Sequence, residues 1–373
     1  MPTLILTGCS SGLGFRVLQQ LLNRFIAPSP SSSPAPTPSS RWRLIAGVRS
    51  PQPSPDQVKL CHLADSFPDE VEVLWLPLDL ADGSGASVKE FVRLVTEQHE
   101  VEKVEGILLN AASWGSGQAK TVKVARDLTG GAAEGEYVEE ALVNHFAQQY
   151  LVRLLLPLLK SAAGPSSRAA VRPRIVYTSS NLHESVSSLD HLPSILFPTS
   201  SASAKTRYAA SKVAALVGAQ SLIEEFASSS PSEEIDVVAV SPGFVPTTKL
   251  SRSSGWLGQM FMRYVMSWAP FAVTEEEGAQ RILRALPLPS SPSPSSPSSS
   301  PTQSDSLTSL LSSSRSAVHP HLVYLSGSSN SPLEEVVKPV GGAVGRLLAD
   351  VEEGNEEAKG QWGEAKRRWG VVA

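Results

Sequence analysis

Tyr208 and Lys212, in the segment Tyr-Ala-Ala-Ser-Lys, are the residues whose types and spacing point most clearly to chemistry. Four positions separate them, so on a helix they lie on one face, one turn apart. A free tyrosine has a pKa of about 10 and transfers protons poorly near neutral pH, whereas a nearby ammonium favours the phenolate and lowers that pKa. The pair therefore predicts a tyrosine that exchanges a proton with a substrate and a lysine that tunes it.

A glycine-rich segment follows the first apolar run, residues 3–7. Gly8 permits a tight turn, Gly12 lets the backbone approach a pyrophosphate, and Gly14 lets the next helix pack closely on the sheet. The free N–H groups at the start of that helix then face the phosphates. An ordinary Gly/Ser turn is the alternative. The residues expected to contact a dinucleotide are Gly8, Ser10, Ser11, Gly12, Leu13 and Gly14.

Arg49 indicates which dinucleotide is bound. At the end of the second strand, a carboxylate binds the ribose 2′-OH of NAD, whereas an arginine accepts the 2′-phosphate of NADP. The segment Ala46-Gly47-Val48-Arg49-Ser50 has no acidic residue. A guanidinium matches a phosphate with paired, charge-assisted hydrogen bonds. NADP(H) is therefore favoured, and a solvated loop arginine is the alternative.

Five further motifs occur in a fixed order along the chain. They are Leu78-Asp79-Leu80, Leu109-Asn110-Ala111-Ala112, Val143-Asn144-His145, Thr178-Ser179-Ser180 and Ser241-Pro242-Gly243-Phe244-Val245-Pro246-Thr247. Together with the glycine spacing TGxxxGxG and the YxxxK pair, this order resembles the classical short-chain dehydrogenase/reductase family over residues 3–286. Ala112 stands where the family has glycine, a small departure from the pattern.

The resemblance implies carbonyl–alcohol chemistry, with a role for each catalytic residue. Ser180 holds the substrate oxygen beside Tyr208, and Ser179 is the less favoured substitute. Lys212 also binds the nicotinamide ribose, and Asn144 holds a water that links Lys212 to solvent. An amide on the helix surface is the alternative for Asn144. His145, next to it, is interpreted as structural.

The resemblance also implies further cofactor contacts. Asp79 and Leu80 border the adenine, although an aspartate that caps the next helix is an equal alternative. Asn110 braces the sheet and the cofactor. The last motif supplies cofactor contacts from Pro242, Gly243, Val245 and Thr247, of which Val245 and Thr247 contact the nicotinamide carboxamide.

The elements that must position these residues alternate along the chain. Short apolar runs at 3–7, 43–48, 71–76, 105–109, 174–178, 235–240 and 321–326 predict strands. Helical periodicity marks 13–26, 86–99, 137–160, 209–226 and 275–286. Continuous apolar strands that alternate with helices predict a Rossmann-type, doubly wound parallel sheet of about seven strands, with helices on both faces. We expect one NAD(P)-binding domain over residues 1–373.

Two Pro/Ser-rich stretches interrupt this pattern, at 27–40 and 287–316, the second almost pure Pro and Ser over 287–305. Such segments have too little apolar surface to offset the entropy of ordering, so we expect insert loops. A C-terminal strand–helix extension, 320–373, carries no recognisable motif.

Composition excludes several classes of protein. The chain of 373 residues has 32 Lys+Arg against 36 Asp+Glu, a formal net charge of −4, which disfavours nucleic-acid binding. Its two cysteines, Cys9 and Cys61, indicate neither a disulfide framework nor a zinc site, and no metal is expected. The cysteine usage indicates a reducing compartment, and no apolar run is long enough for a membrane span. We expect a cytoplasmic protein, with location at a membrane surface as the alternative.

The variable segments suggest an apolar substrate. Tyr208 follows Ser180 by 28 positions, so the insert between them shapes the rim of the cleft. Residues 255–273 are rich in aromatic and methionine side chains, which suit a lipophilic pocket or a membrane surface; a helix packed on its own core explains them equally well. The layout resembles the branch of retinol dehydrogenases, protochlorophyllide reductases and 3-ketosteroid reductases.

The leading hypothesis is thus an NADP(H)-dependent oxidoreductase that acts on a lipophilic ketone, aldehyde or alcohol. A catalytically idle NADP-binding regulatory or scaffold protein of the same fold is the alternative. A nucleotide-sugar epimerase is disfavoured by the glycine spacing.

Overall fold

The structure is a computed structural model. It describes residues 1–26, 41–50, 53–115, 117–129, 135–163, 172–228, 235–246, 272–288, 307, 311, 322–328, 331–338 and 340–370.

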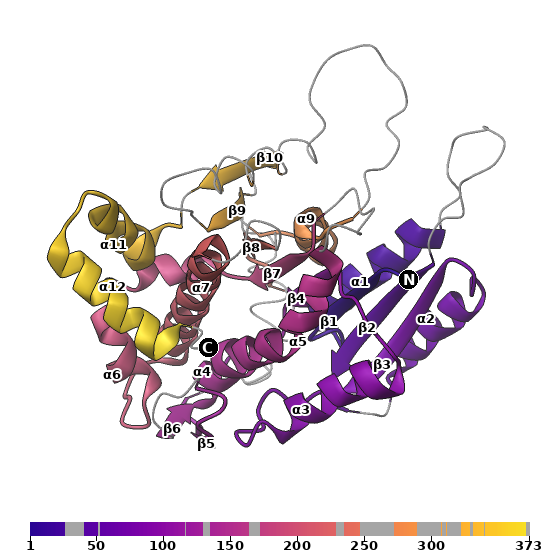
Figure 1. The fold of residues 1–373 in the computed structure, drawn as a ribbon, viewed down its shortest axis with the longest axis horizontal. Coiled ribbons are helices and arrows are strands. Elements are labelled where there is room, and N and C mark those ends of the chain that lie inside the picture. The colour runs from indigo at the N-terminus through magenta and orange to yellow at the C-terminus, as the bar shows by residue number, and fades with distance from the viewer. Residues whose placement is uncertain are drawn as a thin grey trace, which may run out of the picture.

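An eight-stranded sheet forms the centre of the molecule, in the order β10-β9-β8-β7-β4-β1-β2-β3 (Figure 1). Seven strands are parallel, and only β10 runs antiparallel to its neighbour β9. The chain moves outward in one direction from β1 to β3 and then crosses to β4 and moves outward in the other. The strands are β1 (Thr3–Thr7), β2 (Trp42–Val48), β3 (Val71–Pro77), β4 (Gly106–Leu109), β7 (Arg174–Thr178), β8 (Asp236–Ser241), β9 (Val323–Ser328) and β10 (Ser331–Lys338).

The seven predicted strands are confirmed, and β10 is an addition. Its sequence, Ser-Pro-Leu-Glu-Glu-Val-Val-Lys, contains a proline and two glutamates, which did not suggest a strand. Proline and charged residues are tolerated at a sheet edge, where one side of the strand has no partner. Tertiary context therefore decided this element.

Helices cover both faces of the sheet, as the alternating pattern predicts. One face packs against α1 (Gly12–Ile26), α2 (Pro55–Asp65) and α9 (Glu275–Ala285). The other face packs against α3 (Ala86–Arg93), α5 (Ala147–Ala163) and α7 (Ala204–Ser228). Successive strand residues alternate between the two cores: Leu4 and Leu6 face the first, and Ile5 faces the second.

The predicted helix at 137–160 is interrupted. It consists of α4 (Glu139–Ala141), a π-helical turn at Leu142–Phe146 and then α5. Asn144 lies in the middle of that turn, and π turns inside helices are often found at functional sites. The helix predicted at 86–99 likewise ends in a π-helical turn, Leu94–Gln98, after α3.

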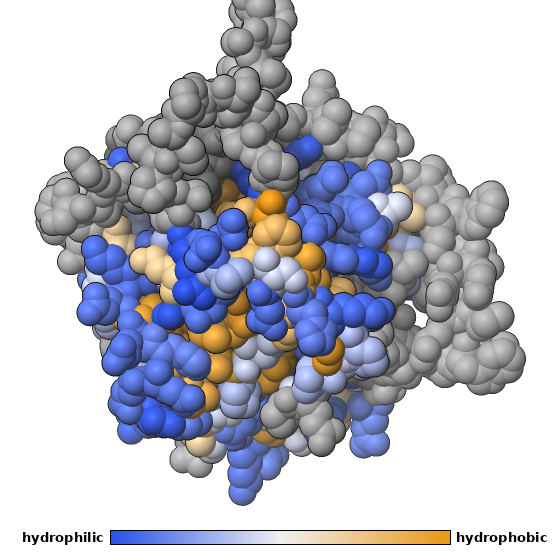
Figure 2. Space-filling model, turned by 90° about the vertical axis from the view of Figure 1, so that its right-hand side faces the viewer, coloured by the Kyte–Doolittle hydropathy of each residue, from blue (hydrophilic) through white to orange (hydrophobic). Residues whose placement is uncertain are grey.

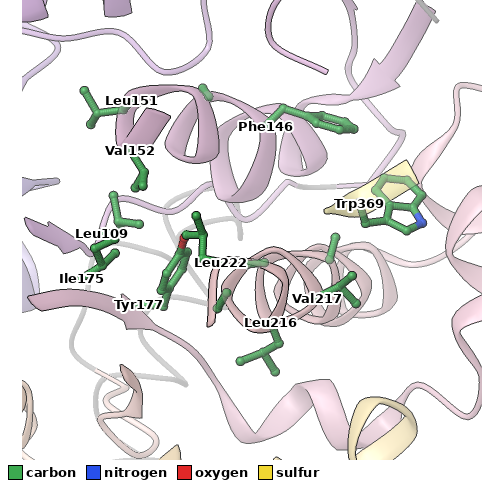
Figure 3. Close-up of a cluster of buried hydrophobic side chains, with 14 of the residues drawn as sticks. Leu109, Phe146, Leu151, Val152, Ile175, Tyr177, Leu216, Val217, Leu222 and Trp369 are labelled. Carbon is green, nitrogen blue, oxygen red and sulfur yellow. The ribbon is translucent and has the colours of Figure 1, made fainter. Parts of the chain in front are cut away.

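The C-terminal extension is part of the core. Its helices α11 (Gly342–Glu352) and α12 (Glu356–Trp369) lie beside α7 (Figure 1). Trp369 stacks on Phe146, with 5.7 Å between ring centroids, and closes the apolar cluster between α5 and α7 that Figure 3 shows. Removing this extension would therefore expose the helices that carry the candidate catalytic residues.

Smaller elements connect the main helices and strands, among them the 3₁₀ turns Asn181–Ser185 and Leu189–His191. A two-stranded antiparallel sheet, β5 (Thr121–Val124) and β6 (Gly135–Val138), precedes α4, and α6 (Leu192–Leu196) precedes α7. Figure 2 shows the side of the molecule near the β3 edge, where hydrophobic surface lies between hydrophilic side chains.

The described parts of the predicted inserts are partly buried. Residues 27–40 lie outside the described residues. Pro287 is buried and Leu288 packs against the first core, and Leu307 and Leu311 are also buried there. The stretch predicted as a loop at 287–316 therefore contains core residues, because its scattered leucines offset the polar composition around them.

Candidate active site

The glycine segment between β1 and α1 forms the tight turn that the sequence predicts. Gly8 and Gly12 adopt left-handed backbone angles, with φ of 72° and 59°. A Cβ on Gly8 would lie 2.7 Å from the Cα of Ala111, and one on Gly14 would lie 2.5 Å from the side-chain nitrogen (Nδ2) of Asn110. Only glycine fits at both positions, because real Cβ atoms do not approach other atoms so closely.

Thr7 and Asn110 fasten this turn to the end of β4. The Thr7 hydroxyl accepts hydrogen bonds from the backbone N–H groups of Asn110 and Ala111, both at 3.0 Å. The Asn110 side chain donates to the carbonyls of Thr7 and Gly8, at 3.4 and 3.5 Å. Asn110 thus braces the turn, in the way the sequence suggests.

The residues present fit a nicotinamide dinucleotide. α1 begins at Gly12 and has no acidic residue in its first turn, so no carboxylate competes with a phosphate there. Ser10 is exposed, while Ser11 and Leu13 are half-buried. Cys9 is fully buried, and burial raises the pKa of its thiol, so it stays protonated and adds no negative charge.

The ends of the next two strands are placed differently. Arg49 is exposed directly after β2. After β3, Asp79 is half-buried and Leu80 is buried. One carboxylate oxygen of Asp79 accepts the N–H of Ala81 at 3.0 Å, and its own N–H donates to the Ser87 hydroxyl at 2.8 Å. Asp79 therefore shapes the turn that follows β3 and leaves its second oxygen for a ligand. It does not cap α3, whose N-cap is Gly85 without a side-chain hydrogen bond, so the alternative of a helix-capping aspartate is wrong.

The Pro-Gly motif after β8 is a second tight turn. Gly243 has φ of 93°, and a Cβ there would lie 2.6 Å from a guanidinium nitrogen of Arg281. That nitrogen donates to the carbonyl of Pro242 at 3.0 Å. Val245 is buried nearby. Thr247 and residues 255–271 of the predicted apolar segment lie outside the described residues.

Tyr208 and Lys212 lie on α7, and both are buried. The Lys212 ammonium nitrogen lies 5.5 Å from the centroid of the Tyr208 ring. It donates a hydrogen bond to the carbonyl of Thr178, the last residue of β7, at 2.7 Å. The predicted pair is thus brought together, one turn apart, against the carboxyl end of the sheet.

Burial moves the pKa values of this pair in opposite directions. It raises the pKa of the Tyr208 phenol, and the neighbouring Tyr324 raises it further. It lowers the pKa of Lys212 to about 8. We expected Lys212 to lower the pKa of Tyr208; in this structure burial instead raises it, because the loss of solvation disfavours the phenolate.

Ser180 follows β7 and caps a 3₁₀ turn, Asn181–Ser185. Its hydroxyl accepts the backbone N–H of Leu182 at 3.3 Å. Ser180 is half-buried, whereas Ser179 is buried. This 3₁₀ turn packs against α7, so Ser180 and Tyr208 belong to adjacent elements. The difference in exposure favours Ser180 over Ser179 as the residue that meets a substrate.

The Asn144 side chain is fully engaged by protein groups. Its oxygen accepts the N–H of Ser113 at 2.7 Å, and its nitrogen donates to the carbonyl of Ser113 at 2.9 Å and to the Ser211 hydroxyl at 2.8 Å. It therefore ties the segment after β4 to α7, next to Lys212. In the structure this side chain braces two segments of the protein. The water that the family resemblance places between Asn144 and Lys212 remains a prediction. His145 is buried, as expected of a structural residue.

Trp114 is a site residue that the sequence analysis missed. Its ring lies against that of Tyr208, with centroids 4.6 Å apart and planes 34° apart. It is half-buried. Its place four residues after Asn110, at the carboxyl end of β4, was the available signal, because ligands bind at this edge of doubly wound sheets.

A buried ion pair holds the Trp114 segment beside Tyr208. The guanidinium of Arg207 lies 3.0 Å from the Glu140 carboxylate, and both side chains are 1% exposed. Arg207 also donates to the carbonyls of Ala202 and Gly117, at 2.6 and 3.3 Å. Nothing in the sequence distinguished this pair from two surface charges.

The chain is similar to known oxidoreductases. No family model matches it. A short-chain dehydrogenase/reductase of Pestalotiopsis microspora is 30% identical over 289 residues, which cover 76% of this chain and 81% of that protein. The Pseudomonas aeruginosa RhlG/NADP active-site complex is similar with a TM-score of 0.49 and 19% identity, over 76% of this chain and 89% of that one. The 3-ketoacyl-(acyl-carrier-protein) reductase of Brucella melitensis, complexed with NADH, has a TM-score of 0.47 and 15% identity, over 75% of this chain and 88% of that one.

Proposed function

Because the chain belongs to the short-chain dehydrogenase/reductase family, we propose that it uses NADP(H) to interconvert a lipophilic ketone or aldehyde and the corresponding alcohol. The observation that carries this proposal is the buried Tyr208–Lys212 pair. Lys212 donates a hydrogen bond to the carbonyl at the carboxyl end of β7. The helix α7, which carries both residues of the pair, packs against the 3₁₀ turn that Ser180 caps.

Bound nicotinamide supplies the hydride for reduction and accepts it in oxidation. The turn from Gly8 to Gly14 and the start of α1 would hold the phosphates. Lys212 would bind the nicotinamide ribose, and the turn at Pro242 and Gly243 would border the nicotinamide.

Tyr208 and Ser180 would act on the substrate. In reduction, the carbonyl carbon gains the hydride, and the oxygen gains the proton of the Tyr208 hydroxyl; in oxidation, the phenolate takes that proton back. Ser180 donates a hydrogen bond to the same oxygen. Below pH 8 Lys212 is a cation, so it stabilises the phenolate that Tyr208 becomes. Proton exchange with solvent past Asn144 would restore the phenol.

Arg49 supports the choice of NADP(H). It is exposed at the end of β2, where the 2′-substituent of the adenosine ribose is read in such folds. No acidic residue stands in the segment from Ala46 to Ser50 to select the free 2′-OH of NAD. A guanidinium there would bind the 2′-phosphate with charge-assisted hydrogen bonds.

Trp114 supports an apolar substrate. Its half-buried ring lies against Tyr208, so the reacting group is flanked by a large aromatic surface. Such a surface gains most from substrates that bury apolar area. The Trp114 ring therefore favours bulky apolar substrates, such as those of the retinol dehydrogenases, protochlorophyllide reductases and 3-ketosteroid reductases of the family.

A substrate panel tests the proposal. Purified protein is mixed with NADPH and with steroid ketones, retinaldehydes or small ketones, and NADPH absorbance is followed. We expect turnover that is fastest for the bulky apolar members. NADPH binding without turnover of any member would favour the idle regulatory protein instead, and faster turnover of small polar ketones would remove the lipophilic assignment.

A further inference from the structure

Two buried side chains lie directly behind Ser180, and the proposed mechanism uses neither. His183, in the 3₁₀ turn that Ser180 caps, is fully buried, and its Nδ1 lies 2.7 Å from the backbone carbonyl oxygen of Ser180. Tyr324, on β9, is 2% exposed, and its hydroxyl donates to the Asn181 side-chain oxygen at 3.2 Å. The two rings meet edge to face, with 5.2 Å between centroids.

His183 holds the Ser180 main chain directly, and Tyr324 holds the side chain of the next residue, Asn181. The Ser180 carbonyl accepts the N–H of His183 in the 3₁₀ turn at 3.1 Å and lies at hydrogen-bond distance from the imidazole. A carbonyl only accepts hydrogen bonds, so Nδ1 must carry the proton. Burial lowers the pKa of His183, which keeps the ring neutral, and burial raises the pKa of Tyr324 to about 12, which keeps its hydroxyl a donor.

The C-terminal extension also contacts this turn beyond Tyr324. Gly342, at the start of α11, has φ of 68°, and a Cβ there would lie 3.0 Å from the Cα of Glu184. The Arg346 guanidinium donates to the carbonyl of Ser187 at 3.0 Å. The extension therefore contacts the segment after Ser180 at four residues: Asn181, His183, Glu184 and Ser187.

We propose that His183 and Tyr324 are positioning residues that fix the Ser180 main chain, so that the C-terminal extension sets the place of the Ser180 hydroxyl beside Tyr208. This inference rests on the proposed function. It gives the extension a role in catalysis that its sequence did not suggest.

A double-mutant cycle with Ser180 tests the inference. Tyr324→Phe removes one hydroxyl, and we expect kcat to fall about fivefold, the effect of one hydrogen bond, with little change in NADPH affinity. In a Ser180→Ala background the same substitution should lower kcat much less, because the hydroxyl that Tyr324 positions is gone and only the electrostatic effect of Tyr324 on Tyr208 remains. Equal losses of kcat in both backgrounds would overturn the inference.

Tyr177→Phe is the matched control. Tyr177 is also buried, and its hydroxyl donates at 3.2 Å to the side-chain oxygen of Gln149, which belongs to α5 and not to the Ser180 turn. It should cost similar thermal stability and leave kcat unchanged. A loss of kcat equal to that of Tyr324→Phe would mean that kcat responds to stability alone, and would overturn the inference.

His183 provides a second route if Tyr324→Phe does not fold. His183→Leu removes the donor to Ser180, whereas His183→Asn places an amide nitrogen near the position of Nδ1. We expect Asn to restore most of the kcat that Leu loses, and equal kcat values would contradict the inference. Wild-type protein without turnover, or a Ser180→Ala variant with unchanged kcat, would instead refute the proposed function and remove the basis of the inference with it.

Discussion

Burial affects the two central residues in opposite senses and thereby divides their roles. A phenol whose pKa is raised stays protonated as a proton donor, while a lysine with a pKa of about 8 is cationic at neutral pH and loses its charge under mildly basic conditions. Both shifts arise because an apolar environment disfavours the charged form. The charge of Lys212 is therefore the part of the site that pH controls most directly.

The rate of carbonyl reduction should follow that charge. We expect kcat/KM to be constant on the acidic side of pH 8 and to fall above it, as Lys212 becomes neutral and no longer stabilises the phenolate. The pH profile, measured with saturating NADPH, checks this. Lys212→Arg, which stays charged, should have a lower kcat/KM that does not fall above pH 8. If the kcat/KM of the wild type stays unchanged up to about pH 10, this lysine does not titrate as described.

Arg49 should discriminate between the two cofactors. Arg49→Ala is expected to weaken NADPH binding roughly tenfold to a hundredfold, because a charge-assisted hydrogen bond contributes about 1.5–3 kcal/mol, and to leave NADH binding nearly unchanged. Fluorescence titration with each cofactor measures this. Arg41→Ala is the control, because Arg41 is an exposed arginine at the other end of the same strand. Equal losses for both cofactors, or a wild-type preference for NADH, would leave Arg49 a solvated surface residue.

At the scale of elements, the turns at the carboxyl ends of β1 and β4 are built against each other. Their closeness is clear at Gly14, where a Cβ would lie 2.5 Å from the side-chain nitrogen of Asn110, a residue of the segment after β4. Thr7 and Asn110 bond the same two segments. The glycine turn is therefore held by a neighbouring strand, in addition to its own sequence.

Gly14→Ala should disrupt this edge. The added methyl would displace Asn110 or the Gly8 carbonyl, so we expect lower thermal stability and loss of NADPH binding. Gly360→Ala is the matched control: it lies within α12 with no atom within 4 Å of its Cβ position, and should stabilise the protein by about 0.5–1 kcal/mol. Thermal melts and NADPH titration compare the two. Unchanged NADPH affinity in Gly14→Ala would argue against the turn as the phosphate site.

The sequence predicted the parts of this edge that depend on local pattern. Seven strands and the Tyr208–Lys212 face follow from apolar runs and a four-residue spacing. The π turn around Asn144 did not follow, since its residues have the same periodicity as a continuous helix, and it coincides with a bond from Asn144 to Ser113, 31 residues away. Trp114 and the Arg207–Glu140 pair were missed for the same reason, because their contacts join segments far apart in the chain.

For the whole molecule, the sheet and its two apolar cores extend into segments whose composition suggested loops. Pro287 lies against Gly106, at the start of β4, and Leu288 packs on the core that contains α1 and α9. The C-terminal helices close the other core with Trp362 and Trp369. No helix in the described ranges is long and apolar enough to cross a bilayer.

Deleting residues 289–305 and closing the gap with a short Gly/Ser bridge should leave folding and turnover nearly unchanged, because loop-closure entropy changes only slowly with length. The longer deletion 287–305 is the control, and it should lower the melting temperature because it also removes Pro287 and Leu288 from the core. Equal melting temperatures for the two deletions would contradict the packing of these two residues.

Comparison of Tyr208→Phe with wild-type protein, for both turnover and NADPH affinity, tests the central claim most directly. The substitution removes the proton donor and leaves the ring against Trp114. We predict that turnover of a substrate accepted by the wild type falls by about 10²-fold or more, while NADPH affinity stays within a few-fold, because phosphates and ribose supply most of the cofactor's binding energy. Turnover within a few-fold of wild type would contradict the assignment of Tyr208 as the proton donor.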